Sequence, residues 1–119
     1  MRDFKELKIW QKAHQLTLDV YRQTKGFPAE ERFGLTSQLR KSASSVPTNV
    51  AEGCGRDGER ELARFCTIAA GSASETESHL HLAHDLGYLP TDAHRELDSQ
   101  VNEIKRMLNS FIQKLMANR

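Results

Sequence analysis

Hydrophobic side chains recur every three or four positions along most of this chain, which is the spacing of one face of an α-helix. Near the start, the apolar positions are Phe4, Leu7, Trp10, Ala13, Leu16, Val20 and Tyr21. Near the end, they step by four and three without interruption through Leu97, Val101, Ile104, Leu108, Phe111 and Leu115. The pattern therefore predicts helices over residues 3–25 and 91–117, and no segment alternates as a strand would.

The middle of the chain predicts two further helices, over residues 35–54 and 58–87, in which small and polar residues replace large apolar ones. Pro47 lies inside the first of them and cannot donate a hydrogen bond to the carbonyl of Ala43. We expect a kink at Pro47, and we expect the neighbouring serines to bond the carbonyls that it frees. The core face of the second helix is expected to be Leu62, Phe65, Ala69, Ser72, Ala73, Thr76, Leu80 and Ala83.

Four helices joined by short loops favour an all-α, antiparallel up-and-down four-helix bundle formed by a single domain over residues 1–119. If the middle pair turns near Asp57, Ala43 faces Gly71 and Ser42 faces Ser72. Because small residues then meet small residues, we expect these two backbones to approach more closely around Gly71 than the usual 8–10 Å.

Composition excludes several classes of protein. With 119 residues, 38% of them hydrophobic and 28% charged, the chain suits one globular domain and not a disordered segment. No apolar run approaches the roughly 20 residues of a membrane span, and the first residues do not form a secretory signal. Cys54 and Cys66 have neither metal-site spacing nor the density of a disulfide scaffold, so we expect a cytoplasmic protein with both thiols reduced.

The net charge of +1 conceals an uneven distribution, because residues 65–103 hold seven acids and one base. The expected topology gathers both chain ends and the turn between the middle helices at one end of the bundle, together with their basic residues: Arg2, Lys5, Lys8, Arg56, Arg60, Arg64, Lys114 and Arg119. We predict phosphate contacts by Arg56, Arg60 and Arg64 first, with Lys5, Lys8, Arg40 and Lys41 behind them. Such recognition would be directed to the nucleic-acid backbone and sensitive to salt, since no aromatic platform for bases is expected.

A second set of polar residues lies on the middle helices, where both helices are expected to pack on two sides. These residues are Gln38, Asn49, Glu52, Arg56, Ser72 and Glu75. Either they form an internal network that fixes the register of the helices, or they make a subunit interface or ligand surface. The facing rule places Gln38 and Arg40 near Glu75.

Candidates for catalysis are weak. His81, His84 and Asp85 share one helix face, but metal sites in helical bundles use paired Glu-x-x-His motifs, which are absent here. Cys54 has no histidine close in sequence, and the glycine-rich turn beside it lacks the lysine and Ser/Thr of a phosphate-binding P-loop. We therefore expect a protein that is not an enzyme, with no metal and no cofactor.

Four ordered motifs resemble one family over almost the whole chain. They are Phe4-x-x-Leu7-x-x-Trp10, Phe27-Pro28-x-x-Glu31-x-x-Gly34-Leu-Thr-Ser-Gln38, Pro47-x-Asn49-x-Ala-Glu-Gly53-x-x-Arg56 and Ala70-Gly71-Ser72-x-x-Glu75. The chain resembles the four-helix-bundle family of 23S rRNA intervening-sequence proteins, and it is similar to the related accessory variability determinants of diversity-generating retroelements. Lys41, Ser42 and Val50 depart from the common pattern, but they affect no activity, since the family has no established catalytic residues.

The resemblance implies a bacterial cytoplasmic bundle that assembles as a ring-shaped homopentamer. It also implies nucleic-acid binding and, for the retroelement relatives, binding to a reverse transcriptase. Our first hypothesis is a non-enzymatic oligomer that binds structured RNA or DNA through a basic surface as a scaffold. The alternative is a protein-binding adaptor that docks a partner enzyme such as a reverse transcriptase.

Overall fold

Hydrophobic spacing and the positions of glycine and proline divide the chain into four long helices, and a computed structural model shows them over the described residues, 2–117. They are α1 (Lys8–Thr24), α2 (Leu35–Cys54), α3 (Glu59–Asp85) and α4 (Thr91–Met116), with short 3-10 turns η1 (Phe4–Glu6) and η2 (Ala29–Glu31). No strand occurs within residues 2–117, so the predicted all-α class is confirmed. The predicted span of α2 is confirmed residue for residue, and those of α3 and α4 to within two residues at each end.

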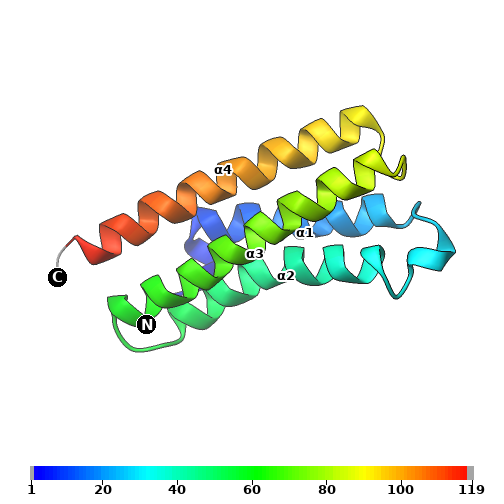
Figure 1. Ribbon diagram of the computed structural model, residues 1–119. Coiled ribbons are helices and arrows are strands. Elements are labelled where there is room, and N and C mark those ends of the chain that lie inside the picture. Colours follow the sequence, from blue (N-terminus) through cyan, green and yellow to red (C-terminus); the bar gives the residue numbers. More distant parts are fainter. Residues whose placement is uncertain (1, 118–119) are drawn as a thin grey trace.

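The helices lie along one long axis in a body of 47 × 22 × 20 Å. Figure 1 shows the start of the chain, the α2–α3 turn and the last turns of α4 at one end, and the α1–α2 and α3–α4 connections at the other. A backbone hydrogen bond of 3.2 Å from Arg2 N–H to the Cys54 carbonyl ties the start of the chain to the end of α2. The arrangement therefore brings residues distant in sequence to the same end of the molecule.

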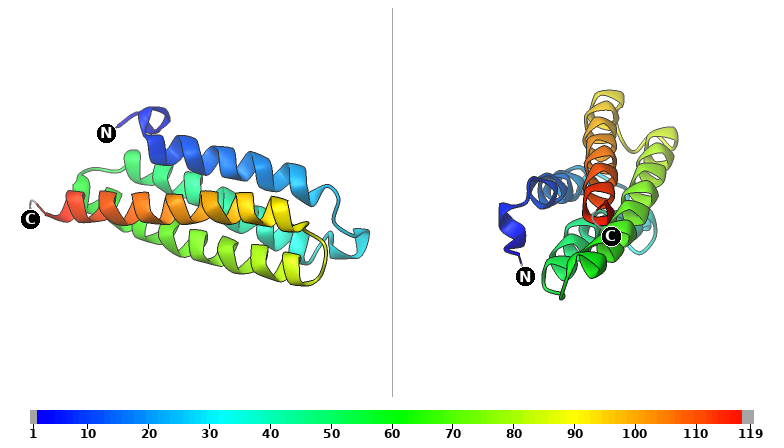
Figure 2. Two further views of the ribbon diagram at one scale, coloured as in Figure 1. Left: turned by 90° about the horizontal axis from the view of Figure 1, so that it is seen from above. Right: turned by 90° about the vertical axis from the view of Figure 1, so that its left-hand side faces the viewer.

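The first predicted helix, over residues 3–25, is wrong at its start. Leu7 has an extended backbone, with φ −81° and ψ 126°, and it separates η1 from α1. The Asp3 carboxylate caps η1 by accepting a hydrogen bond of 3.0 Å from Lys5 N–H. The break turns the first residues out of line with α1, as Figure 2 shows, and lets Phe4 pack edge-on against Trp10 at 5.0 Å between ring centroids.

The core is built from one apolar face of each helix. Its largest fully buried side chains include Leu16 of α1, Leu39 of α2, Leu80 of α3 and Ile104 of α4. Tyr21, expected on the apolar stripe of the first helix, is 43% exposed, whereas Ile9 at the start of α1, which was not assigned to that stripe, is buried. Within residues 2–117, none of the helices combines the length and the apolar character that crossing a lipid bilayer requires.

Pro47 lies inside α2, and the carbonyl that it frees is satisfied from another helix. The single hydroxyl proton of Thr17 on α1 is shared between the Ala13 carbonyl of its own helix, at 2.9 Å, and the Ala43 carbonyl across the interface, at 3.2 Å. The serines beside Pro47 bond elsewhere, since Ser44 donates to the Lys41 carbonyl. The loss of a partner at Ala43 was predicted correctly, but the group that replaces it was not.

The close contact between α2 and α3 occurs at Gly53 and not at Gly71. A Cβ atom added to Gly53 would lie 2.9 Å from Leu62 Cδ1 and 3.0 Å from Phe65 Cβ, whereas nothing lies within 4 Å of a Cβ added to Gly71. Gly71 is exposed, so the expected packing role of this residue is wrong. The two helices are displaced by about one turn from the expected facing pairs, because Ser42 bonds Thr76 rather than facing Ser72.

Candidate functional site

Two of the three predicted arginines at the start of α3 converge on one aromatic ring. The guanidinium carbon of Arg56 lies 5.1 Å from the centroid of Phe65, and that of Arg64 lies 4.5 Å from it. Phe65 is itself buried, so its ring forms a fixed base on which both guanidinium groups rest through cation–π contacts at the surface. Arg56 lies in the turn before α3 and not within the helix, while Arg60 and Arg64 lie in the helix itself. We refer to Arg2, Arg56, Arg60 and Arg64 as the arginine cluster.

Carboxylates accompany most of the arginine cluster. Arg56 Nε lies 3.1 Å from Glu52 Oε2, and Arg64 Nε lies 3.0 Å from Glu61 Oε2. The bond from Arg64 holds the pKa of the Glu61 carboxyl below its usual range. Arg2 lies 3.7 Å from Glu59, while no ion pair within residues 2–117 holds Arg60. The cluster thus offers many N–H donors, but the neighbouring carboxylates offset most of its positive charge.

A small hollow lies within the arginine cluster. Its volume is about 110 Å³, and its walls include Arg2, Arg56, Glu59 and the backbone of Gly53 and Gly58. The backbone of Gly58 has a φ of +85°, which favours glycine at this turn.

The remaining predicted phosphate contacts divide between two places. Lys5 lies in η1 at the same end as the arginine cluster, with its amine 5.9 Å from the Phe4 ring, and Lys8 begins α1. Arg40 and Lys41 lie on α2, where they line a surface hollow of about 500 Å³. Lys114 lies on α4 beside Phe111, and Arg119 lies outside the described residues.

Arg40 packs against α1 and not against α3 as expected. Its Nε donates to Thr24 Oγ1 at 2.7 Å, and its guanidinium lies 4.6 Å from the centroid of the Tyr21 ring. Thr24 is buried, so this contact ties the first half of α2 to the end of α1. The expectation that Arg40 lies near Glu75 is therefore wrong.

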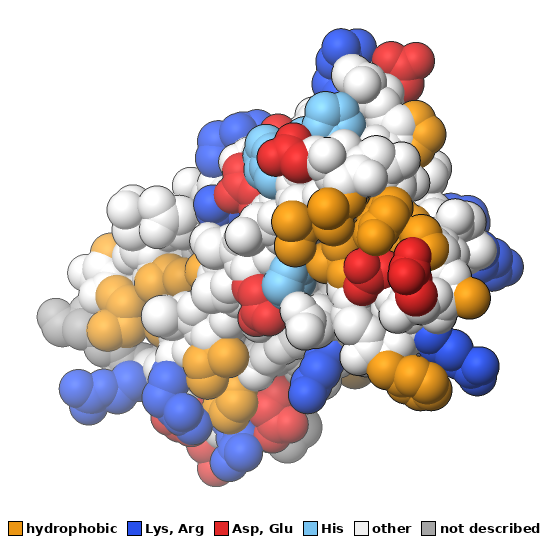
Figure 3. Space-filling model, turned by 45° about the vertical axis from the view of Figure 1, so that its right-hand side comes forward, with side chains coloured by type: hydrophobic (Ala, Val, Ile, Leu, Met, Phe, Trp, Pro, Cys, Tyr) orange, Lys and Arg blue, Asp and Glu red, His pale blue; other side chains and the backbone are white. Residues whose placement is uncertain are grey.

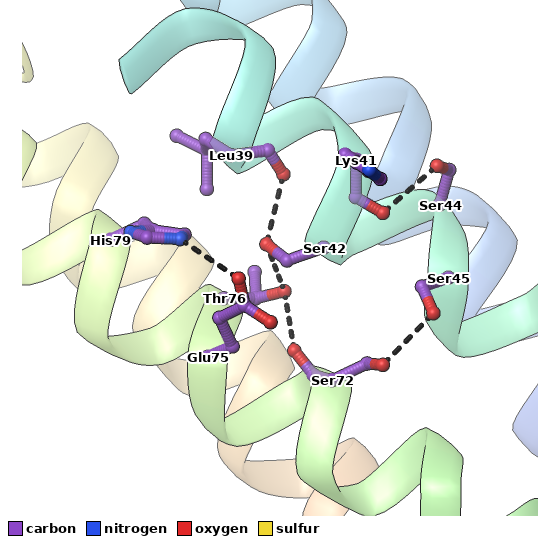
Figure 4. A network of polar contacts seen from close by, with 9 residues as sticks. All are labelled: Leu39, Lys41, Ser42, Ser44, Ser45, Ser72, Glu75, Thr76 and His79. Atoms are coloured by element: carbon purple, nitrogen blue, oxygen red, sulfur yellow. Dashed lines mark hydrogen bonds and ion pairs between the residues drawn. The ribbon is translucent and has the colours of Figure 1, made fainter. Parts of the chain in front are cut away.

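A line of hydroxyl groups joins α2 and α3, which Figure 4 shows from close by. We call Ser42, Ser45, Ser72 and Thr76, together with the Asn49 amide that bonds to Ser45, the hydroxyl seam. Thr76 Oγ1 lies 2.9 Å from Ser42 Oγ, and Ser45 Oγ lies 2.9 Å from Ser72 Oγ. Asn49 Nδ2 donates to Ser45 Oγ at 2.9 Å. Its members occupy positions where many bundles carry large apolar residues, so paired hydroxyls set the register here.

The other residues predicted for a polar network lie outside the hydroxyl seam. Gln38 is exposed, and Glu75 is an exposed residue whose carboxylate lies 3.3 Å from His79 Nε2. Glu52 and Arg56 form the predicted i,i+4 pair, but at the surface, where each side chain is 49% exposed. The structure thus brings Asn49 and Ser72 into one network and leaves Gln38, Glu52, Arg56 and Glu75 at the surface.

An apolar groove of about 670 Å³, which sequence analysis missed, lies between α1 and α2. Its walls include Phe4, Trp10, His14, Pro47 and Ala51. The Trp10 ring is half-buried and stacks on the His14 ring at 4.7 Å between centroids. Trp10 was assigned to the core from its place in the apolar stripe, but in the structure it is half-buried and lines this groove.

The opposite end of the molecule is rich in histidines and acidic residues, which Figure 3 shows beside a patch of hydrophobic side chains. Exposed hydrophobic residues at this end include Phe33, Leu82 and Leu86. The His94 ring stacks on His84 and meets His81 edge-on, with both centroid distances 4.6 Å. Burial, and then the neighbouring His81 and His84, lower the pKa of His94.

Comparison with known proteins places the chain beside one family model and several solved structures. A family model described as 23S rRNA-intervening sequence protein matches residues 5–110. A solved structure of a protein with unknown function from the S23 ribosomal protein family of Bacteroides thetaiotaomicron is similar to this chain with a TM-score of 0.79 and 20% identity. The similarity covers 88% of this chain and 98% of that one, and at this level of identity it shows a shared fold. None of the curated proteins matches the chain.

Proposed function

The chain belongs to the 23S rRNA-intervening sequence protein family, and from this premise we propose that it binds the phosphate backbone of structured nucleic acid through the arginine cluster. In this proposal the protein is a non-enzymatic scaffold. The description of the family names 23S rRNA, so structured RNA is the first ligand to test.

The observation that carries the proposal is the placement of Arg56 and Arg64 against Phe65. A guanidinium stacked on an aromatic ring keeps its edge accessible to acceptors, in the fork that matches two phosphate oxygens. A phosphate would compete there with the Glu52 and Glu61 carboxylates, which accept from Arg56 and Arg64 at the surface. The ring limits the movement of both side chains, so less conformational entropy is lost when a phosphate binds. Arg60, one helical turn from Arg64, adds a third donor group to the same surface.

Self-association would multiply this surface. We propose that copies of the chain form a ring-shaped oligomer, with the groove between α1 and α2 as one side of the contact. The groove is largely apolar, contains a half-buried tryptophan and runs beside Pro47 and Ala51, which are features of surfaces that pack against another protein. A ring would repeat the arginine cluster around its axis, which concentrates the positive potential of each copy.

The decisive experiment compares two double charge reversals with the same change in net charge. R56E/R60E alters the arginine cluster, whereas the matched control R22E/R95E alters α1 and α4 away from it. Binding of a structured 23S rRNA fragment and of a duplex is measured at several salt concentrations. We expect R56E/R60E to lose at least about tenfold in affinity and to show a shallower dependence on salt, because each lost phosphate contact lowers the slope by about one.

Light scattering on the same variants separates binding from assembly. Equal loss of binding in R56E/R60E and R22E/R95E would contradict a role for the arginine cluster, as would wild-type affinity that does not fall as salt rises. A stable single protomer at micromolar concentration would contradict the proposed ring.

A second candidate function, a protein-binding adaptor, rests on the opposite end of the molecule. Leu82 and Leu86 are 47% and 49% exposed near the end of α3, and Phe33 is 88% exposed in the facing connection. Exposed leucine and phenylalanine beside acidic side chains fit a protein partner with an apolar and basic surface, such as a nucleic-acid enzyme of the reverse transcriptase class. Unchanged nucleic-acid retention by R56E/R60E, with L82S/L86S losing a pulled-down partner, would favour this function.

A further inference from the structure

Two buried polar atoms on α4 lack partners. Among the described residues, His94 Nε2 and Asp98 Oδ1 are the buried side-chain atoms that make no hydrogen bond. The two residues are four apart on one helix, so their side chains lie on the same face. Buried polar groups without a partner are rare in folded proteins and call for an explanation.

A third polar side chain reaches this position from the facing helix, α3. His81 on α3 places Nε2 3.6 Å from Asp98 Oδ1, and the ligand atoms of His81, His94 and Asp98 all lie within 4.8 Å of one another. The sequence brings His94 and Asp98 together through helix periodicity, but only the packing of α3 on α4 adds His81. The spacing of the α3 histidines in the sequence could not predict this group, because two of its members lie on α4.

The neighbouring histidines have other partners. His84 Nε2 lies 3.1 Å from Thr91 Oγ1, and the His84 ring is stacked on His94 with an angle of 15° between the planes. His79 Nε2 lies 3.3 Å from Glu75. These contacts hold His84 as a support for the His94 ring and leave His81, His94 and Asp98 as the converging set.

We propose that His81, His94 and Asp98 bind one divalent transition metal ion of the zinc class, which links the end of α3 to the first turns of α4. Two imidazole nitrogens and one carboxylate oxygen suit Zn²⁺, Co²⁺ or Ni²⁺ rather than Mg²⁺ or Ca²⁺, which take oxygen ligands. The ion would satisfy both orphaned atoms of α4 together, and water would complete its coordination.

The distances set what must move on binding. Zinc–nitrogen and zinc–oxygen bonds of about 2.0–2.2 Å require ligand atoms within roughly 4 Å of one another. The His81 side chain is 56% exposed and is therefore free to turn inward by the remaining distance. His94 and Asp98 are half-buried and form the fixed side of the site.

The test uses the full chain without a histidine tag, freed of metal by a chelator. Calorimetric titration with Zn²⁺ should show one ion bound per chain, and Co²⁺ should give visible absorption from nitrogen–oxygen coordination. Thermal unfolding should occur about 5 °C or more higher with excess Zn²⁺, because the ion binds the folded chain preferentially. Mg²⁺ should show no binding in the calorimetric titration and should not raise the temperature of unfolding.

Variants assign the ligands. We expect H94A and the isosteric D98N to weaken Zn²⁺ binding by at least about tenfold, since even changes in groups behind a ligand cost 10- to 100-fold. H79Q, a matched histidine change on α3, should bind as wild type. Retained Zn²⁺ affinity in D98N, equal loss in H79Q, or a wild-type chain that binds no Zn²⁺ would each overturn the proposal. Circular dichroism of D98N checks that any loss of binding is not a loss of fold.

Discussion

Pro47 deprives the Ala43 carbonyl of the backbone N–H that a helix normally supplies, and a side chain of another helix takes its place. Thr17 Oγ1 of α1 lies 3.2 Å from this carbonyl, and Ala43 is fully buried. A buried carbonyl without a partner costs about 1–3 kcal/mol. One hydroxyl on α1 therefore compensates for a proline on α2, at the position where the two helices pack.

Replacement of Thr17 by valine tests this compensation. T17V keeps the shape of the side chain but leaves the Ala43 carbonyl unpaired, so we expect the free energy of unfolding to fall by about 1–3 kcal/mol. Urea denaturation measures the change. In a P47A background the backbone N–H of residue 47 returns, so T17V should cost clearly less there. An equal cost in both backgrounds would refute the link between Thr17 and Pro47.

The Cys66 thiol predicts a dependence of stability on pH. Burial, followed by the neighbouring Cys54, raises the pKa of Cys66 from 9.0 to about 11. Below pH 9 the thiol is protonated in both states, and its full contribution to stability is present. Above pH 9 the unfolded chain loses the proton first, so stability falls as pH rises towards 11.

The size of this fall follows from the shift in pKa. A shift of about two pKa units corresponds to a loss of roughly 2–3 kcal/mol at most. We expect the unfolding free energy of wild type, measured by urea denaturation, to decrease more steeply between pH 9 and pH 11 than that of C66A. Parallel curves for the two proteins would contradict a buried thiol at this position.

At the scale of helices, α2 and α3 are matched by a close approach at one end and by the hydroxyl seam in the middle. Leu62 and Phe65 of α3 pack directly against Gly53 in the last turn of α2, in the space that a side chain at this position would fill. The hydroxyl seam then holds Ser42 against Thr76 and Ser45 against Ser72. Because hydroxyl pairs require specific partners, they define the axial position of one helix on the other more narrowly than apolar contacts do.

The two glycines of these helices should respond in opposite ways to alanine. G53A places a Cβ 2.9 Å from Leu62 Cδ1, so we expect it to destabilise the protein by about 1–3 kcal/mol. G71A meets open space on an exposed helix interior and should stabilise by about 0.5–1 kcal/mol. Thermal or urea denaturation of both variants checks the pair. A stabilising G53A, or a destabilising G71A, would contradict the packing described for α2 and α3.

At the scale of the whole molecule, charge is less separated than its distribution along the sequence suggests. Glu52, Glu59 and Glu61 accompany the arginine cluster at the end that was predicted to be basic. A bound phosphate must therefore compete with carboxylates for Arg56 and Arg64. This competition lowers the affinity for phosphate, but in the free protein the ion pairs keep the arginine side chains oriented at the surface.

Neutralising the competing carboxylates should strengthen nucleic-acid binding. E52Q/E61Q frees Arg56 and Arg64 from their ion pairs, and we expect affinity for structured RNA to rise about twofold to tenfold. E30Q/E96Q is the matched control, because it changes the net charge equally at the opposite end of the molecule. Filter retention at fixed salt measures both. Equal gains in the two variants would show that net charge acts without a local site.

The sequence by itself determined the elements of this protein. Helix formation depends on neighbours three and four positions apart, so the spacing of apolar residues located all four helices and most of their core faces. Pro47 likewise predicted an unpaired carbonyl four residues earlier, because the missing N–H of proline is a local property. The nucleic-acid contacts named from sequence stay a prediction, although the structure groups three of them at one surface.

Only the tertiary structure decided which residues meet. The displacement of α3 by about one turn paired Ser42 with Thr76, moved the close approach to Gly53 and left Gly71 exposed. The same packing turned Arg40 to α1 and brought His81 to His94 and Asp98. The physical reason is that the axial shift and rotation of packed helices depend on the sum of many side-chain contacts between segments distant in sequence. The spacing within one helix contains no information about that sum.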